Sequence, residues 1–374
     1  MFVYFIVATI SIILLLGVAV TFYRWRRLQC YNQSPLNIKT FDGRNSPYHP
    51  TVLYFKEGWN GYKYWMAETP FSPQCKPYMD RDECPSIHVS NDGINWFEII
   101  KSPIDDLNEQ EIKELDFFSD PHLVYANGRL ECWYRFTHRK GKANYYDNLQ
   151  LVRRTSYDGR KWSDREMLVN LATKEGDALG NALVSPAIQY NNGTYRMWFV
   201  DSESRTTRNI AYSESTNGYD WTEKKICSLN GSENTPWHID VNIIDGKYYL
   251  LSYNFDNITL WKSEDGLNFS FMKEILKPSV FGSFYGYSLY RACIIKDEKY
   301  KVYFSGNDSL NTYIGLLQGE DINNLVFVPN GKHLNLLQLI TFQYKFKSRS
   351  AKFIIKRILK KLSKNKSVYY NGCI

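Results

Sequence analysis

The stretch Ser90-Asn91-Asp92-Gly93-Ile94-Asn95-Trp96 recurs along the chain and decides the fold. Its other copies are Ser156-Tyr157-Asp158-Gly159 with Trp162, Ser215-Thr216-Asn217-Gly218 with Trp221, and Ser263-Glu264-Asp265-Gly266 with Phe269. Asp-Gly and Asn-Gly are typical of two-residue β-hairpin turns, in which both central residues take positive φ. A hairpin turn that returns every 48 to 66 residues indicates that one antiparallel unit has been copied.

Each of these turns follows a turn glycine and a strand with alternating aromatic residues. The copies are Gly61 to Trp65, Gly128 to Tyr134, Gly193 to Phe199, Gly246 to Leu251 and, without the glycine, Glu298 to Phe304. Alternation with a period of two in runs rich in Tyr, Trp, Val and Ile predicts β-strands. Each unit is therefore expected to contain strand A, a glycine turn, strand B, a loop, strand C, the Asp-Gly turn and strand D.

Five such units fit between about residues 45 and 330. Repeated four-stranded units that close into a ring form a β-propeller, and an aromatic content of 16% suits packing between radially stacked sheets. The sequence predicts an all-β five-bladed β-propeller at residues 45–332, with blade 5 degenerate because it lacks an Asp-Gly turn. A two-sheet β-sandwich is the alternative.

The N-terminal end differs from the repeats. Residues 2–22 carry no charge, and about 20 apolar residues span a bilayer as a helix. We expect a transmembrane anchor at residues 1–23 and a juxtamembrane linker at residues 24–44; a cleaved signal peptide is the alternative. Basic residues only follow the apolar stretch, at Arg24, Arg26 and Arg27, which favours a single-pass membrane protein with the propeller facing the cytoplasm.

The C-terminal end, residues 333–374, carries a basic amphipathic pattern. Ten basic residues lie between Lys345 and Lys366, and apolar residues follow helical spacing from Ala351 to Leu362. Such a helix binds anionic membrane surfaces; nucleic acid and a solvated tail are the other possibilities. Without the two ends, the formal charge of +7 becomes about −6, which argues against nucleic acid as a partner of the propeller.

Polar residues are expected at the central axis, where the innermost strands of a propeller meet. Eight residues before the strand A–B turn lie Asp120, Ser185 and His238; the matching residues are His49 in blade 1 and Tyr290, next to Arg291, in blade 5. His49, Asp120 and Ser185 each precede a proline, which we interpret as the start of a strand. The end of strand B adds Arg135, and strand C adds Glu83.

This set of side chains suits saccharide chemistry. Carboxylates act as general acid and base, and aromatic faces such as Trp59 and Trp237 stack on sugar rings. An arginine beside Asp120 would keep its carboxylate ionised. The histidines and acids lack the short spacing of metal ligands, so neither a metal nor another cofactor is predicted. Alternatively, Asp120 and Asp240 only cap strand starts.

The blade motifs resemble the five-bladed propeller glycosidases, a superfamily that includes glycoside hydrolase families 32, 43, 68, 117 and 130. The motifs are Ser119-Asp120-Pro121-His122-Leu123, Ser185-Pro186 with Tyr195 to Phe199, Trp237-His238-Ile239-Asp240-Val241 and Tyr290-Arg291-Ala292. The blade 1 run from Gly58 to Ala67, with Glu83 to Ile87, looks like uncharacterised bacterial members. The chain is more weakly similar to the propeller domain of glucosamine inositolphosphorylceramide transferases.

The resemblance implies three catalytic acids, and two of their positions differ here. His49 and Ser185 stand where family 43 enzymes carry acids. Asp120 would then act as base or stabiliser, Glu83 as proton donor and Asp240 as the acid that tunes them. His49, Arg135, Ser185, His238 and Arg291 would bind the substrate.

Three functions remain open from the sequence. The favoured one is a membrane-anchored glycoside hydrolase acting on an envelope or capsular saccharide. The second is a participant, such as a transferase, in the biosynthesis of an envelope polysaccharide or glycolipid. The third is a glycan-binding propeller without catalysis, which the substituted acid positions favour.

Overall fold

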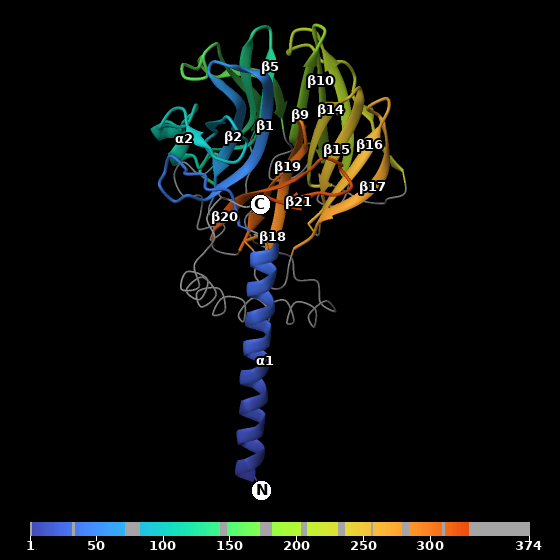
Figure 1. Cartoon of the computed structure of the whole chain (residues 1–374). Helices are drawn as coiled ribbons and strands as arrows, with labels where there is room; N and C mark the ends of the chain where they lie inside the picture. The colour runs from blue at the N-terminus through green and yellow to red at the C-terminus, as the bar shows by residue number, and fades with distance from the viewer. Residues whose placement is uncertain are drawn as a thin grey trace.

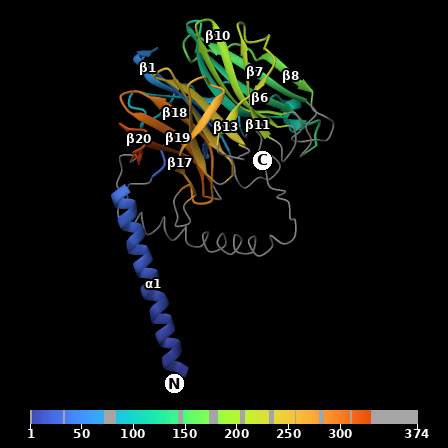
Figure 2. The same cartoon turned by 90° about the vertical axis from the view of Figure 1, so that its right-hand side faces the viewer.

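The computed structural model describes residues 2–31, 34–71, 83–142, 148–172, 182–202, 208–230, 236–255, 257–278, 284–308 and 311–328. Their strands form five sheets, drawn with the long N-terminal helix in Figures 1 and 2. The innermost strands contact one another in the cyclic order β1, β5, β9, β14, β18 and back to β1. The predicted five-bladed β-propeller is therefore confirmed, and the sandwich alternative is wrong.

Each blade is an antiparallel sheet whose strands follow one another in chain order from the axis outwards. Blade 1 contains β1 (Pro47–Trp59), β2 (Tyr62–Pro70), β3 (Ser86–Ser90) and β4 (Phe97–Glu98). Blade 2 contains β5 (Phe117–Ala126), β6 (Arg129–His138), β7 (Asn148–Ser156) and β8 (Glu166–Ala172). Blade 3 contains β9 (Ala182–Asn191), β10 (Thr194–Ser202), β11 (Arg208–Ser215) and β12 (Lys225–Ile226).

The last two blades follow the same plan with one addition. Blade 4 contains β14 (His238–Ile244), β15 (Lys247–Tyr253), β16 (Ile258–Ser263) and β17 (Asn268–Leu276). A short strand, β13 (Ser228–Asn230), pairs in parallel with the outer edge of β17. Blade 5 contains β18 (Ser288–Lys296), β19 (Tyr300–Asn307), β20 (Thr312–Gly319) and β21 (Val326–Phe327). Between blades 1 and 2, α2 (Glu109–Lys113) begins with a capping box at Asn108.

The repeated Ser-Xaa-Asp-Gly stretch forms a turn different from the predicted one. Gly93 has a φ of 72°, but Asp92 is not among the positive-φ residues, so the two-residue hairpin with two positive φ values is wrong. Ser90 Oγ accepts from the backbone N–H of Asp92 and Gly93, and Asp92 Oδ1 accepts from those of Ile94 and Asn95. Because side chains satisfy these amides, the chain forms a longer loop between β3 and β4.

The turn glycines pack against an aromatic residue of the neighbouring blade. Gly159 of blade 2 lies so close to Trp65 of blade 1 that an added Cβ would be 2.1 Å from Trp65 Cζ3. The other pairs are Gly218 with Trp133, Gly266 with Trp198, and Gly93 with Tyr303. Each repeated turn thus joins its blade to the one before it. We call these four pairs the glycine–aromatic contacts.

The same contact closes the ring between the first and last blades. Tyr303 of β19 donates its hydroxyl to the carbonyl of Gly93, with an O···O distance of 2.9 Å. Leu36 and Ile38, which were predicted to belong to the juxtamembrane linker, are buried in the apolar cluster between these blades. Leu36 N–H also donates to Ile314 O of β20. The segment before β1 is thus part of the packed propeller.

The N-terminal residues form the helix α1 (Phe2–Tyr31), which projects away from the blades with the N-terminus at its far end (Figure 1). Large apolar side chains such as Tyr4, Leu15 and Val18 are exposed along it. Among the residues that the structure describes, no helix is both long and apolar enough to cross a membrane. The predicted basic amphipathic helix lies outside the described residues, which end at residue 328.

Candidate active site at the propeller axis

Three residues of the innermost strands share an unusual backbone conformation. They lie at the propeller axis, which we call the hub. His49, Asp120 and Ser185 have φ values of 53°, 55° and 52°. This left-handed conformation costs a non-glycine residue about 1–2 kcal/mol. Each one lies at a register shift in the pairing of its innermost strand, immediately before a proline. The prolines were expected at strand starts, but they lie inside β1, β5 and β9 at β-bulges, where the missing N–H is tolerated.

The bulges direct the side chains of His49 and Asp120 towards His238, the first residue of β14. One ligand atom each of His49, Asp120 and His238 lies within 4.8 Å of the others, and all three side chains are buried. His238 Nδ1 is 3.3 Å from Asp120 Oδ1. Three separate blades therefore contribute one group, which we call the hub triad.

Asp120 carries the negative charge of the hub triad. Its Oδ2 accepts from Arg135 Nη1 at 2.9 Å and from the backbone N–H of Ser185 at 3.1 Å. Burial pushes the pKa of Asp120 upwards, but electrostatic interactions with His238, Arg135 and Arg291 outweigh burial and hold the pKa well below its usual range. At neutral pH His238 is uncharged, and the two arginines supply the positive charge. The carboxylate is thus ionised at neutral pH, as the sequence analysis expected from a neighbouring arginine.

The two histidines of the hub triad are neutral imidazoles. Burial lowers the pKa of His49 to about 3, and it also lowers the pKa of His238 well below its ordinary value. His49 Nδ1 lies 2.9 Å from Thr69 Oγ1, which leaves Nε2 with no hydrogen-bond partner among the described residues. Both ring nitrogens of His238 also lack such a partner in the described part of the chain. A buried ring nitrogen without a hydrogen-bond partner destabilises the folded protein unless a further group binds it.

This donor set fits a divalent metal ion. Two neutral imidazole nitrogens and one carboxylate are ligands that Zn²⁺ and related transition metals bind, and the orphaned nitrogens point to such a group. A metal site was not predicted from the sequence because the three residues come from three blades, 71 and 118 positions apart. A ligand motif with short spacing could not have revealed them.

A second layer of polar side chains lies beneath the hub triad. Asp240 is two residues beyond His238 on β14, and its Oδ1 is 3.7 Å from His122 Nδ1. Burial raises the pKa of Asp240 to about 6. Arg291 donates to the carbonyls of Pro121 and Pro186 and is fully buried. Asp240 and Arg291 are as buried as the hub triad itself, and the roles predicted for them at the substrate stay predictions.

Aromatic residues form one wall beside the hub triad. The ring centroid of Tyr290 is 4.0 Å from that of His238 and 5.1 Å from that of His49. Tyr48 stacks on Tyr290, and Trp237 donates its Nε1–H to the Tyr290 hydroxyl. Burial, followed by the charge of Asp120, raises the pKa of Tyr290 well above its ordinary value, so the phenol keeps its proton. Tyr48 was missed because it immediately precedes an axial residue and only the bulge turns it inward.

Of the remaining predicted residues, Glu83 and Ser185 lie near the hub triad, whereas Trp59 lies at the other end of its strand. Glu83 is buried with its Oε1 3.8 Å from His49 Nδ1, and Ser185 Oγ donates to Ile239 O. Trp59 does not join them. It lies ten residues after His49, roughly 30 Å along an extended strand, and its ring packs on Trp65 and Phe55.

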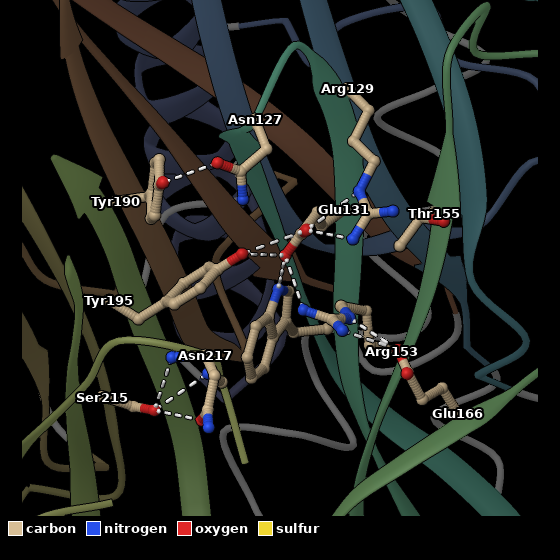
Figure 3. A network of polar contacts seen from close by, with 12 residues as sticks. Asn127, Arg129, Glu131, Arg153, Thr155, Glu166, Tyr190, Tyr195, Ser215 and Asn217 are labelled. Carbon is tan, nitrogen blue, oxygen red and sulfur yellow. Dashed lines mark hydrogen bonds and ion pairs between the residues drawn. The ribbon is translucent and has the colours of Figure 1, made fainter. Parts of the chain in front are cut away.

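A polar pocket of about 570 Å³ lies between blades 2 and 3, at the opposite end of β5 and β6 from Asp120. The buried Glu131 behind it accepts from Arg129, Arg153 and Tyr195, as Figure 3 shows. It also accepts from the Nε1–H of Trp133. Arg153 also donates to Glu166. The arginines and carboxylates of this network all belong to blade 2, and the hydroxyl of Tyr195 on β10 links them to blade 3.

Comparisons with known proteins agree with this architecture. No protein-family model matches the chain. The crystal structure of an N-acetylgalactosamine deacetylase from F. plautii, in complex with blood group B trisaccharide, has a TM-score of 0.61 and 20% identity, covering 77% of this chain and 94% of that one. A GH43 β-xylosidase/α-arabinofuranosidase from a compost metagenome has a TM-score of 0.54 and 11% identity, covering 80% and 99%. The fold is that of the five-bladed propeller glycosidases and their relatives.

A relative is also found by sequence. The A type blood N-acetyl-α-D-galactosamine deacetylase of Flavonifractor plautii is 24% identical over 333 residues, which cover 76% of this chain. The match spans only 42% of that relative's length. These similar proteins are named as enzymes that act on carbohydrates, a deacetylase and a glycosidase.

Proposed function

We propose that the protein is a metal-dependent hydrolase that removes the acetyl group from an N-acetylated amino sugar of a glycan. The observation that carries the proposal is the hub triad, in which two neutral imidazoles and one ionised carboxylate converge. The similarity to an N-acetylgalactosamine deacetylase supports this choice of bond.

His49, Asp120 and His238 would hold the metal ion. When bound, a divalent ion lowers the pKa of a water ligand and polarises a carbonyl. Thr69 Oγ1, 2.9 Å from His49 Nδ1, orients that ring so that Nε2 faces the hub. Arg135 keeps Asp120 ionised.

Two further side chains are suited to handle the substrate. The Tyr290 phenol stays protonated and can donate to the acetamide oxygen, while its own oxygen accepts from Trp237. Glu83, on the Nδ1 side of His49, can accept a proton from the attacking water and pass it to the amine. The aromatic wall offers faces for the sugar ring.

Acetate release tests this function. We expect the purified protein to release acetate from oligosaccharides that contain N-acetylgalactosamine or N-acetylglucosamine when Zn²⁺ or Mn²⁺ is supplied. Chelation with EDTA should abolish the release, and addition of excess metal should restore it. Acetate release that is insensitive to EDTA would contradict the role of the hub triad.

Glycoside hydrolysis remains the second candidate, because Glu83 places a further carboxylate beside the hub and the pKa of Asp240 is raised to about 6. In this alternative Asp120 is base or stabiliser, Glu83 the proton donor and Asp240 the tuning acid. The same incubation distinguishes the two functions. New reducing ends without acetate would favour glycoside hydrolysis, and saccharide binding with neither product would favour a glycan-binding propeller.

We also propose that residues 2–22 anchor the protein in a membrane with the propeller on the cytoplasmic side. The stretch is uncharged, and the exposed apolar side chains of α1 support this proposal. We expect the full chain to stay in the membrane fraction after a carbonate wash and a chain lacking residues 2–31 to be released. Release of the full chain by carbonate would contradict the anchor. A reporter fused after residue 374 that works only outside the cell would contradict the sidedness.

A further inference from the structure

Arg291 reaches the hub from blade 5 and is 0% exposed. Its Nη1 donates to Pro121 O at 2.9 Å, and its Nη2 donates to Pro186 O at 2.9 Å. Nη2 also lies 3.2 Å from His122 Nδ1. One guanidinium therefore contacts the innermost strands of blades 2 and 3 from the innermost strand of a third blade.

The identity of these acceptors is informative. Pro121 and Pro186 directly follow Asp120 and Ser185, the residues of β5 and β9 that adopt positive φ. The carbonyls that Arg291 binds therefore belong to the bulges themselves. Because a left-handed conformation is unfavourable for aspartate and serine, an outside contact is needed to hold it.

The two bulges are also linked to the rest of the hub triad. The backbone N–H of Ser185 donates to Asp120 Oδ2, and Ser185 Oγ lies 3.0 Å from the backbone nitrogen of Ile239, the residue after His238. A shift of either bulge would move Asp120 relative to His238.

The contacts explain why arginine occupies this position. A planar guanidinium presents N–H groups in a fixed fork, so two carbonyls from different strands can be held at a set separation. His122 suits the same fork: its Nε2 lies 3.0 Å from Ile188 O, which assigns the ring proton to Nε2 and leaves Nδ1 as an acceptor. A lysine has no such fork.

We propose that Arg291 is a positioning residue that fixes the bulges of blades 2 and 3 and thereby sets the position of Asp120 in the hub triad. This replaces the substrate-binding role expected for it from the sequence. The inference rests on the proposed function where it concerns turnover and Zn²⁺ affinity. The backbone geometry can be measured without it.

The test compares Arg291→Lys with Arg153→Lys as a matched control. Arg153 is also buried, also uses a fork to join its partners and also lies between blades, but it binds Glu131 and Glu166 in the network of Figure 3. Both variants should lower the melting temperature. Zn²⁺ affinity is measured by titration calorimetry, and the backbone at residues 120 and 185 is read from crystal structures.

We expect Arg291→Lys to weaken Zn²⁺ binding by roughly 10- to 100-fold, the usual effect of losing a residue that orients a ligand. Asp120 or Ser185 should leave the positive-φ region, and kcat should fall more than KM rises. Arg153→Lys should keep wild-type affinity and hub geometry.

Two results would overturn the inference. One is an Arg291→Lys structure in which Asp120 and Ser185 keep their φ values and the hub triad its distances. The other is an equal loss of Zn²⁺ affinity in both variants, which would reduce Arg291 to a structural role. If no acetate release is detected even for the wild type, the proposed function fails while the crystallographic comparison still decides the role of Arg291.

Discussion

Replacing Gly159 with alanine is expected to destabilise the propeller strongly. The new Cβ would lie 2.1 Å from Trp65 Cζ3, and Trp65 is fully buried. The left-handed backbone, with a φ of 73° at Gly159, adds about 1–2 kcal/mol, and overpacking adds typically about 1–3 kcal/mol. The expected loss of about 2–5 kcal/mol is a large part of the stability of an ordinary domain, roughly 5–15 kcal/mol. Denaturant unfolding measures it.

Gly193→Ala is the matched control for this prediction. Gly193 also has a positive φ, 77°, but its added Cβ would meet no atom within 4 Å. This variant should lose only the backbone contribution of about 1–2 kcal/mol. Equal losses in the two variants would contradict the view that the glycine–aromatic contacts hold neighbouring blades together.

The second large effect is expected from Asp120→Asn, which should lower turnover by roughly 10²- to 10⁴-fold. Asparagine keeps the shape of the side chain but removes the charge that pairs with Arg135 and lies 3.3 Å from His238. It also replaces an anionic ligand of the hub triad with a neutral amide. Acetate release under saturating metal measures the effect.

Asp116→Asn separates catalysis from stability. Asp116 is an equally buried carboxylate, bound to His138 Nδ1 at 2.9 Å and to the backbone N–H of Arg139, outside the hub triad. Removing one partner of a buried ion pair destabilises a protein by about 3–5 kcal/mol, so both variants should unfold earlier. Only Asp120→Asn should lose turnover in the folded state. Comparable activity losses in both would mean that Asp120 acts through stability alone.

The repeated turns made the fold predictable. One seven-residue repeat marked the positions of four blades in the sequence. A fixed offset from each strand A–B turn then located Asp120, Ser185 and His238, which the structure brings to one axis. The type of turn was not predictable from the Asp-Gly pair. The Ser90 and Asp92 side chains bind four backbone amides and thereby stabilise a longer loop.

The position of each side chain relative to the hub triad was harder to predict. Residues two apart on a strand share a face, so Asp240 follows His238 into the axis but lies one layer further in. At the bulge of β18, Tyr290 joins the aromatic wall, whereas the neighbouring Arg291 lies beneath the hub triad. Trp59 was placed by its chemistry rather than its offset, and it lies at the far end of a 13-residue strand.

The most direct test of the hub triad as a metal site is anomalous X-ray diffraction from crystals soaked with Zn²⁺ and measured at the zinc absorption edge. We predict one strong peak bonded to His49 Nε2, an Asp120 carboxylate oxygen and a ring nitrogen of His238. Crystals that take up zinc at other sites and show no peak among these three side chains would contradict it.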